Sequence, residues 1–213
     1  MILTRNKMQR TLLGRGVQHS ECSFAFGNIP SWLDCSSTEF ADNSLLVSGS
    51  SNYIKTSAVA LANMDLLSVK FENLNLTSDL CSCSIMFENE SGTIKFGILS
   101  SPSENKTYFK IFNGNTETYS KEVGTFDGAK YWYLAYGANA SADCHIASRP
   151  RNIEICYSPS YDIFFVEDDG YEVFQFAGVA GMISITGNWS VVVRNDYDIS
   201  TSNVVFEIQQ SVS

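Results

Sequence analysis

The sequence predicts an all-β fold, namely a two-sheet antiparallel jelly-roll sandwich with a short N-terminal arm. Apolar and polar residues alternate with a period of two in many segments, as half-buried strands require. Turn residues separate these segments roughly every 8–15 residues. No segment carries a 3.6-residue apolar stripe over three turns. Residues 57–67 are the best helical candidate, and a loop or a short strand fits them equally well.

The alternation is clearest in residues 81–88, CSCSIMFE, where most apolar side chains share one face of the expected strand. Residues 69–72 and 94–98 repeat the pattern. Further strands are expected over 22–26, 45–47, 53–56, 107–112, 131–136, 151–157, 162–166, 171–176, 182–186, 189–194 and 204–209. The turns are expected at Asn113-Gly114-Asn115, Asp127-Gly128, Asp169-Gly170 and Gly187-Asn188. So many short strands in one domain imply two packed sheets.

The chain is expected to form one domain. Its 213 residues suit one large β-sandwich, and no Pro/Gly/Ser-rich linker longer than a turn divides them. Because the first credible strand begins near Cys22, we expect an N-terminal arm over residues 1–20 and the jelly-roll domain over residues 21–213.

The charge is divided between these two parts. The arm holds four basic residues, Arg5, Lys7, Arg10 and Arg15, and no acidic one, whereas residues 21–213 hold 10 basic and 23 acidic residues. An acidic body repels phosphate backbones, so nucleic acid is excluded as its partner. We expect the arm to be an assembly element that meets acidic patches on identical neighbours, which predicts a homo-oligomer. The alternatives are a solvated tail and an arm that folds back along an edge strand of its own sandwich.

The N-terminal sequence lacks the features of a secretory signal. Basic residues interrupt the apolar stretches of residues 1–17, and no run approaches the roughly 18 apolar residues of a membrane span. We therefore expect synthesis in a cytosol, where the six cysteines stay reduced.

An ordered set of short segments carries a family resemblance. FGNIPSW at 26–32 precedes NSLLV at 43–47 and YIKT at 53–56, and IKFGI at 94–98 and YWYL at 131–134 follow. This order resembles the concanavalin A-like lectin/glucanase family and its laminin-G-like relatives over roughly residues 20–210. The resemblance implies the jelly-roll fold and carbohydrate binding.

Domains of this family recur in phage tail and head appendages, and an acidic chain rich in Asn, Ser, Thr and Gly is similar to those. We therefore expect a non-enzymatic virion component that is made in the host cytoplasm. It would adhere to host glycans or to neighbouring structural proteins. One alternative is a purely structural assembly protein without a glycan site. The other is a glycan-degrading glycosidase.

Aromatic residues, 13% of the chain, supply the ligand-binding candidates. Sugar rings stack on Trp and Tyr faces while polar groups fix their hydroxyls. One expected strand carries aromatics on both faces, Trp189 follows a turn, and Trp32 follows Pro30. The expected ligand-binding residues are Trp132, Trp189, Trp32, Tyr131, Tyr133 and Tyr136. For each of them the alternative is an ordinary core or interface aromatic.

Catalytic residues are not expected. Residues 167–172 spell E-x-D-x-x-E, the spacing that glucanases of this fold place on one strand. Because Asp169-Gly170 is a strong hairpin signal, we expect a turn that splays Glu167 and Glu172 away from any sheet face. With two histidines and no G-x-S-x-G elbow, a nucleophilic triad is unsupported as well.

No metal or other cofactor is expected. The soft ligands of note are Cys81-Ser82-Cys83, Cys144-His145 and His19. A C-x-C pair on a strand places both sulfur atoms on one face, which here is the predicted core face, whereas zinc sites use C-x₂₋₄-C pairs. A calcium site from loop oxygens, at Asp196 and Asp198 or at Asp168 and Asp169, is the open alternative.

Overall fold

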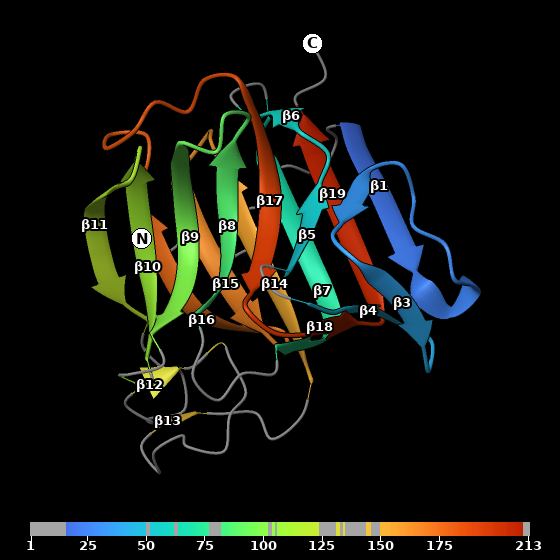
Figure 1. Ribbon diagram of the computed structural model, residues 1–213. Coiled ribbons are helices and arrows are strands. Elements are labelled where there is room, and N and C mark those ends of the chain that lie inside the picture. Colours follow the sequence, from blue (N-terminus) through green and yellow to red (C-terminus); the bar gives the residue numbers. More distant parts are fainter. Residues whose placement is uncertain are drawn as a thin grey trace.

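Two antiparallel sheets face each other across one core in the computed structural model (Figure 1). This arrangement confirms the predicted all-β sandwich. The structure describes residues 16–49, 52–61, 64–76, 82–101, 106–123 and 150–210, together with 104, 131, 132, 134, 144 and 145. Within these residues, no helix has the length and apolar character that a membrane span requires.

Among the described residues, the first sheet has nine strands and lies at the back in Figure 1. Its central strand β7 pairs with β14, β19 and β18. The outer strands continue as β15 and β16 beyond β14, β1 beyond β19, and β4 and β3 beyond β18. The bounds are β1 Gly16–Ser23, β3 Thr38–Ala41, β4 Ser44–Val47, β7 Leu66–Leu76, β14 Arg151–Ser158, β15 Ile163–Asp168, β16 Tyr171–Ala177, β18 Ile199–Thr201 and β19 Asn203–Gln210.

The second sheet has eight strands in the described part of the chain, in the order β11-β10-β9-β8-β17-β5-β2, with β6 also paired to β17. Its bounds are β2 Leu33–Cys35, β5 Asn52–Thr56, β6 Val59–Ala60, β8 Cys83–Asn89, β9 Ile94–Ser101, β10 Lys106–Asn113, β11 Thr116–Glu122 and β17 Asn188–Asn195. A short parallel pair joins β12 (Tyr131–Trp132) to β13 (Cys144–His145), and one 3₁₀ turn, η1, spans Phe24–Phe26.

Aromatic rings fill the space between the sheets. Phe96 is at the centre, stacked on Phe87 with 5.0 Å between ring centroids and meeting Tyr157 edge-on at 5.0 Å. Trp189 lies against the same ring at 5.5 Å. Such ring pairs contribute about 0.5–1.5 kcal/mol each beyond the area they bury, so this cluster fixes how the sheets pack.

The predicted turn at Asp169-Gly170 is confirmed. Both residues have positive φ, 49° and 84°, the backbone that a two-residue hairpin turn needs. The turn joins β15 to β16. Asp168 pairs with Tyr171 next to the turn, and Ile163 pairs with Ala177 at the other end of the two strands.

The sandwich begins earlier in the sequence than expected. β1 starts at Gly16 and pairs with β19 along its whole length, so residues 16–20 of the expected arm belong to a strand that is outermost among the described strands. The expected strand over 22–26 is instead the end of β1 followed by η1. Residues 1–15, with Arg5, Lys7, Arg10 and Arg15, lie outside the described residues.

Other local expectations also differ from the structure, among them the strand expected over 131–136, which in the described residues is the two-residue β12. The segment 182–186 is not a strand but a loop, in which the backbone N–H groups of Met182 and Ile183 donate to the carbonyl of Val179. β11 was not expected, because its sequence TETYSKE is mostly polar. It is an outer strand that pairs only with β10 among the described strands, and such strands often carry charged side chains.

The cysteines of the described core carry thiols and not disulfide bonds: Cys22, Cys35, Cys83 and Cys156. Burial raises the pKa of the Cys35 and Cys83 thiols to about 12. We therefore expect these thiols to stay protonated and to react slowly with a thiol reagent at pH 8 in the native protein. The denatured, unreduced protein should titrate close to six thiols; a count of two or fewer would show a disulfide framework.

Candidate functional site

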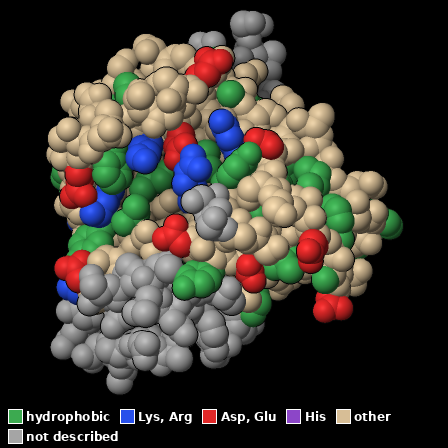
Figure 2. Space-filling view, in the orientation of Figure 1, with side chains coloured by type: hydrophobic (Ala, Val, Ile, Leu, Met, Phe, Trp, Pro, Cys, Tyr) green, Lys and Arg blue, Asp and Glu red, His purple; other side chains and the backbone are tan. Residues whose placement is uncertain are grey.

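The outer face of the second sheet combines charged and hydrophobic side chains (Figure 2). Along each strand, alternate residues face the core and solvent, so Phe109 and Ile111 of β10 are buried while Tyr108, Lys110 and Phe112 face outward. In the part of the chain that the structure describes, the basic residues on this face are Lys55, Lys95, Lys106, Lys110 and Arg194.

Most charges on this face are balanced by ion pairs. Lys110 Nζ lies 2.6 Å from Glu117 Oε2, and Lys106 Nζ lies 2.9 Å from Glu122 Oε2, across β10 and β11. Arg194 of β17 meets Glu88 of β8 at 2.8 Å. The face therefore has little net charge, unlike the acidic chain as a whole.

Two half-buried rings of β10 each have an ammonium group beside them. Lys95 Nζ lies 5.2 Å from the centroid of Phe112, and Lys110 Nζ lies 5.5 Å from that of Tyr108. We call this surface, made by Lys95, Tyr108, Lys110 and Phe112, the Tyr108–Phe112 face. It offers ring surfaces for stacking next to hydrogen-bond donors.

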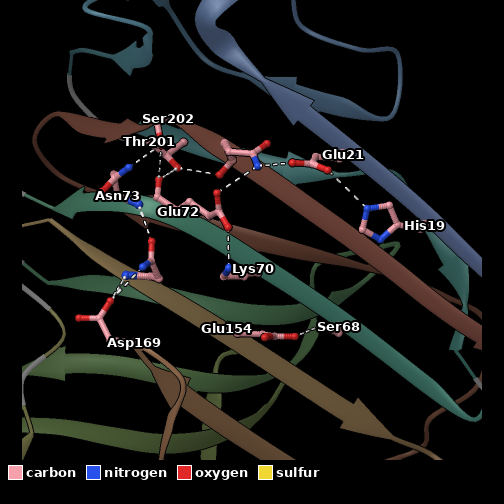
Figure 3. A network of polar contacts seen from close by, with 12 residues as sticks. His19, Glu21, Ser68, Lys70, Glu72, Asn73, Glu154, Asp169, Thr201 and Ser202 are labelled. Carbon is pink, nitrogen blue, oxygen red and sulfur yellow. Dashed lines mark hydrogen bonds and ion pairs between the residues drawn. The ribbon is translucent and has the colours of Figure 1, made fainter. Parts of the chain in front are cut away.

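A groove crosses the outer face of the first sheet (Figure 3). Its volume is about 540 Å³, and six of its lining side chains are carboxylates. Strand pairing explains how they come together: Glu21, Val205, Lys70, Glu154 and Glu167 occupy one row across β1, β19, β7, β14 and β15. We call this the acidic groove. Its lining residues are His19, Glu21, Ser68, Lys70, Glu72, Asn152, Glu154, Glu167, Asp169, Gly170, Val205 and Glu207.

Hydrogen bonds hold several of these carboxylates in place. Lys70 donates to Glu72, and this bond is the main reason why the pKa of Glu72 lies below its usual value. Asn203 Nδ2 donates to Glu21 at 2.7 Å and to Glu72 at 3.2 Å. Ser68 donates to Glu154, which is buried. The groove is thus an organised acidic surface.

The E-x-D-x-x-E string forms the predicted hairpin, but the expectation that the turn splays Glu167 and Glu172 away from the sheet is wrong, because both lie in paired strands. Glu167 is paired with Glu154 across the strands and lines the acidic groove. Glu172 lies opposite Glu167 on β16, and burial raises the pKa of its carboxyl. Asp168 faces the other way and is buried beside Arg151.

The structure moves Trp189 from the ligand candidates to the core. Its side chain is fully buried, and its indole N–H donates to the carbonyl of Thr186 at 3.1 Å. Trp32 is half-buried and stacks on Phe206 with ring centroids 5.8 Å apart. Trp189 thus matches the alternative of a core aromatic that the sequence left open, whereas Trp32 packs against the core and stays partly exposed.

The other aromatic candidates are described only in part. Tyr131 and Trp132 form β12, next to β10, and their side chains lie outside the described part of the chain. Tyr133 and Tyr136 lie outside the described residues altogether. Sequence reasoning missed the outward rings of β10, although the i, i+2 spacing of Tyr108, Lys110 and Phe112 in KTYFKIFN could have revealed them.

The described residues hold no group of three or more His, Cys, Asp or Glu side chains placed to share a metal ion. The side chains of Cys81, Cys144 and His145 lie outside this description. Asp196 and Asp198 lie in the loop after β17, where the carbonyl of Asp198 accepts a hydrogen bond from Asn195.

No protein-family model matches the sequence, and no curated protein does. Solved structures share the fold. The carbohydrate recognition domain of Emp47p is 11% identical, with a TM-score of 0.56 over 89% of this chain and 94% of that one. β-Agarase A from Zobellia galactanivorans is 9% identical, with a TM-score of 0.61 over 93% and 95%. The Bacillus licheniformis β-glucanase is 10% identical, with a TM-score of 0.53 over 91% and 98%. This fold therefore occurs in a lectin domain and in glycosidases.

Proposed function

We propose that this chain is a carbohydrate-binding protein that holds a glycan on the Tyr108–Phe112 face and does not cleave it. The observation that carries the proposal is the pair of outward rings on β10, each with a lysine ammonium group within 5.5 Å of its centroid. Pyranose rings stack on such aromatic faces, while nearby charged groups bond their hydroxyls. The occurrence of this fold in a carbohydrate recognition domain supports the assignment.

The arrangement of carboxylates on this face argues for binding over hydrolysis. A retaining glycosidase needs two carboxyl groups about 5–5.5 Å apart. Glu88 lies on β8, Glu117 and Glu122 lie on the outer strand β11, and two strands separate β8 from β11. At about 4.8 Å per strand spacing, that separation exceeds the retaining distance. Each of the three also pairs with a basic side chain.

Screening on an array that includes agarose and β-1,3-1,4-glucan oligosaccharides, followed by calorimetry on the best ligand, tests the proposal. Phe112→Ala should weaken binding by about 1–3 kcal/mol, by analogy with bases that stack on aromatics. The matched control is Phe26→Ala, because Phe26 is 82% exposed on η1, away from this face.

Equal loss in both variants, or none in either, would remove the glycan site from the Tyr108–Phe112 face. If the protein releases reducing ends from a polysaccharide that it binds, the glycosidase alternative would replace the proposal of a binding protein. A ligand-dependent change in tryptophan fluorescence that disappears in Trp132→Phe would add Trp132 to the site, because Trp189 is buried in the core.

The virion role is a finer proposal within this function. Its support is the acidic composition of the chain, rich in Asn, Ser, Thr and Gly. Adhesion to host glycans and contact with neighbouring structural proteins are the two uses it predicts. Mass spectrometry of purified virions would test it by the presence and copy number of this chain.

A further inference from the structure

The acidic groove is built to receive positive charge. Six carboxylates line it, from Glu21, Glu72, Glu154, Glu167, Asp169 and Glu207, whereas its basic lining residues are Lys70 and His19. Like charges that lie opposite each other across two strands, such as Glu154 and Glu167, destabilise a sheet unless a cation lies near them. Lys70, which lies opposite Glu154 in the same row, supplies one such cation, and a cationic partner would balance the remaining carboxylates.

A buried acceptor beside the groove gives a second, independent indication. Asn203 is 7% exposed, and its Oδ1 has no hydrogen-bond partner. The orientation of this amide is fixed, because its Nδ2 donates to the carboxylates of Glu21 and Glu72. The site therefore needs further hydrogen-bond donors. Guanidinium and ammonium groups supply donors only, whereas a hydroxyl or an amide brings acceptors as well.

An apolar cluster adjoins the acidic groove on the same outer face. Leu66, Cys156 and Phe165 are 0% exposed and Ile163 is 9% exposed, and they form a cluster separate from the core between the sheets. Cys156 and Phe165 continue the cross-strand row that starts with His19, Glu207 and Ser68. Because these side chains are already buried, they offer a partner of this face little apolar surface, and the charges of the groove are what such a partner meets.

We propose that residues 1–15 of the same chain dock along the acidic groove. This segment holds Arg5, Lys7, Arg10 and Arg15 with no acidic residue, and also Ile2, Leu3, Met8, Leu12 and Leu13. Its cations match the carboxylates of the groove and the acceptor of Asn203.

The connection of the chain favours docking within one molecule. Residue 15 leads directly into β1, the edge strand whose His19 and Glu21 line the groove. Fifteen extended residues reach about 50 Å, and the five strands from β1 to β15 span about 20 Å. A tethered segment that can reach its site competes at millimolar effective concentration, so it excludes the same segment of a neighbour.

Limited trypsin digestion of the full chain tests the proposal, with mass spectrometry following cleavage after Arg5, Lys7 and Arg10. Docking should protect these bonds at low salt, and 1 M NaCl should speed their cleavage about tenfold by screening the charges. The double variant Glu21→Gln, Glu167→Gln should show the faster cleavage at low salt. The matched control, Glu117→Gln, Glu122→Gln on the second sheet, should cleave like the unmodified chain.

Cleavage that is equally fast at both salt concentrations in the unmodified chain would overturn the proposal, and this comparison needs no variant. If the two double variants are cleaved at equal rates at low salt, the segment does not dock in the acidic groove. Carbodiimide coupling of Lys7 in a mixture of ¹⁵N-labelled and unlabelled protein checks the source of the segment. We expect cross-links within one isotope form; abundant mixed-isotope cross-links would show that a second copy supplies it.

Discussion

Replacement of Gly97 by alanine is expected to destabilise the sandwich by about 3–5 kcal/mol, near the upper end for single substitutions. Gly97 lies in β9, between β8 and β10, with a φ of 154°. A Cβ atom there would lie 2.3 Å from the carbonyl oxygen of Ile85 and 2.8 Å from the Cα of Met86. Both are backbone atoms, so β8 and β9 would have to separate and lose hydrogen bonds at the centre of the second sheet.

Urea unfolding followed by fluorescence would measure this loss, because Trp189 is buried next to Phe96 of the same strand. The control is Gly114→Ala in the turn after β10. Its φ is 65° and no atom lies within 4 Å of the added Cβ, so only the left-handed backbone strain of about 1–2 kcal/mol applies. A Gly97→Ala variant as stable as this control would show that the strands can shift without cost.

The alternation of residue types predicted those strands whose core face is apolar. β8, β9, β14 and β17 bury every second side chain or more, so a period of two is visible in their sequences. β11 carries one half-buried apolar residue, Tyr119, among polar ones, and the same criterion misses it. Its place comes from pairing with β10, which is a tertiary effect.

The same alternation also explains why Trp189 is buried. Trp189, Val191 and Val193 share one face of β17, and all three are 0% exposed. The position of Trp189 directly after a turn favoured a surface site in the sequence, but a strand that starts at Asn188 already has its core face at residue 189. The alternation along the strand is therefore a better predictor of the burial of Trp189 than its position next to a turn.

The acidic groove could not be predicted, because it depends on register between distant strands. Glu21, Glu154 and Glu167 lie on β1, β14 and β15, and only the pairing of these strands through β19 and β7 puts the carboxylates in one row. The turn at Asp169-Gly170 depends on adjacent residues and was predicted. The residue opposite Glu167 on the neighbouring strand depends on strand pairing, which the residues around Glu167 do not reveal. A shift of one residue in any pairing would move the carboxylates to the other face.

Removal of the Asp168 carboxylate is the other substitution with a large expected effect. Arg151 Nη1 lies 3.0 Å from Asp168 Oδ2, and the two side chains are 6% and 4% exposed. Arg151 also donates to the carbonyl of Leu134, so it ties β14 to the segment after β12. Asp168→Ala leaves the guanidinium buried without this carboxylate and should cost about 3–5 kcal/mol in urea unfolding.

An exposed ion pair serves as the control for the loss of stability. Glu117→Ala breaks the ion pair with Lys110, where the side chains are 40% and 19% exposed, and should cost less than about 1 kcal/mol because solvent screens it. The double variant Arg151→Met, Asp168→Leu should recover most of the loss of Asp168→Ala, because apolar side chains then replace both buried charges. If Asp168→Ala costs no more than Glu117→Ala, water reaches Arg151 in solution, and the pair does not hold β14 to β15.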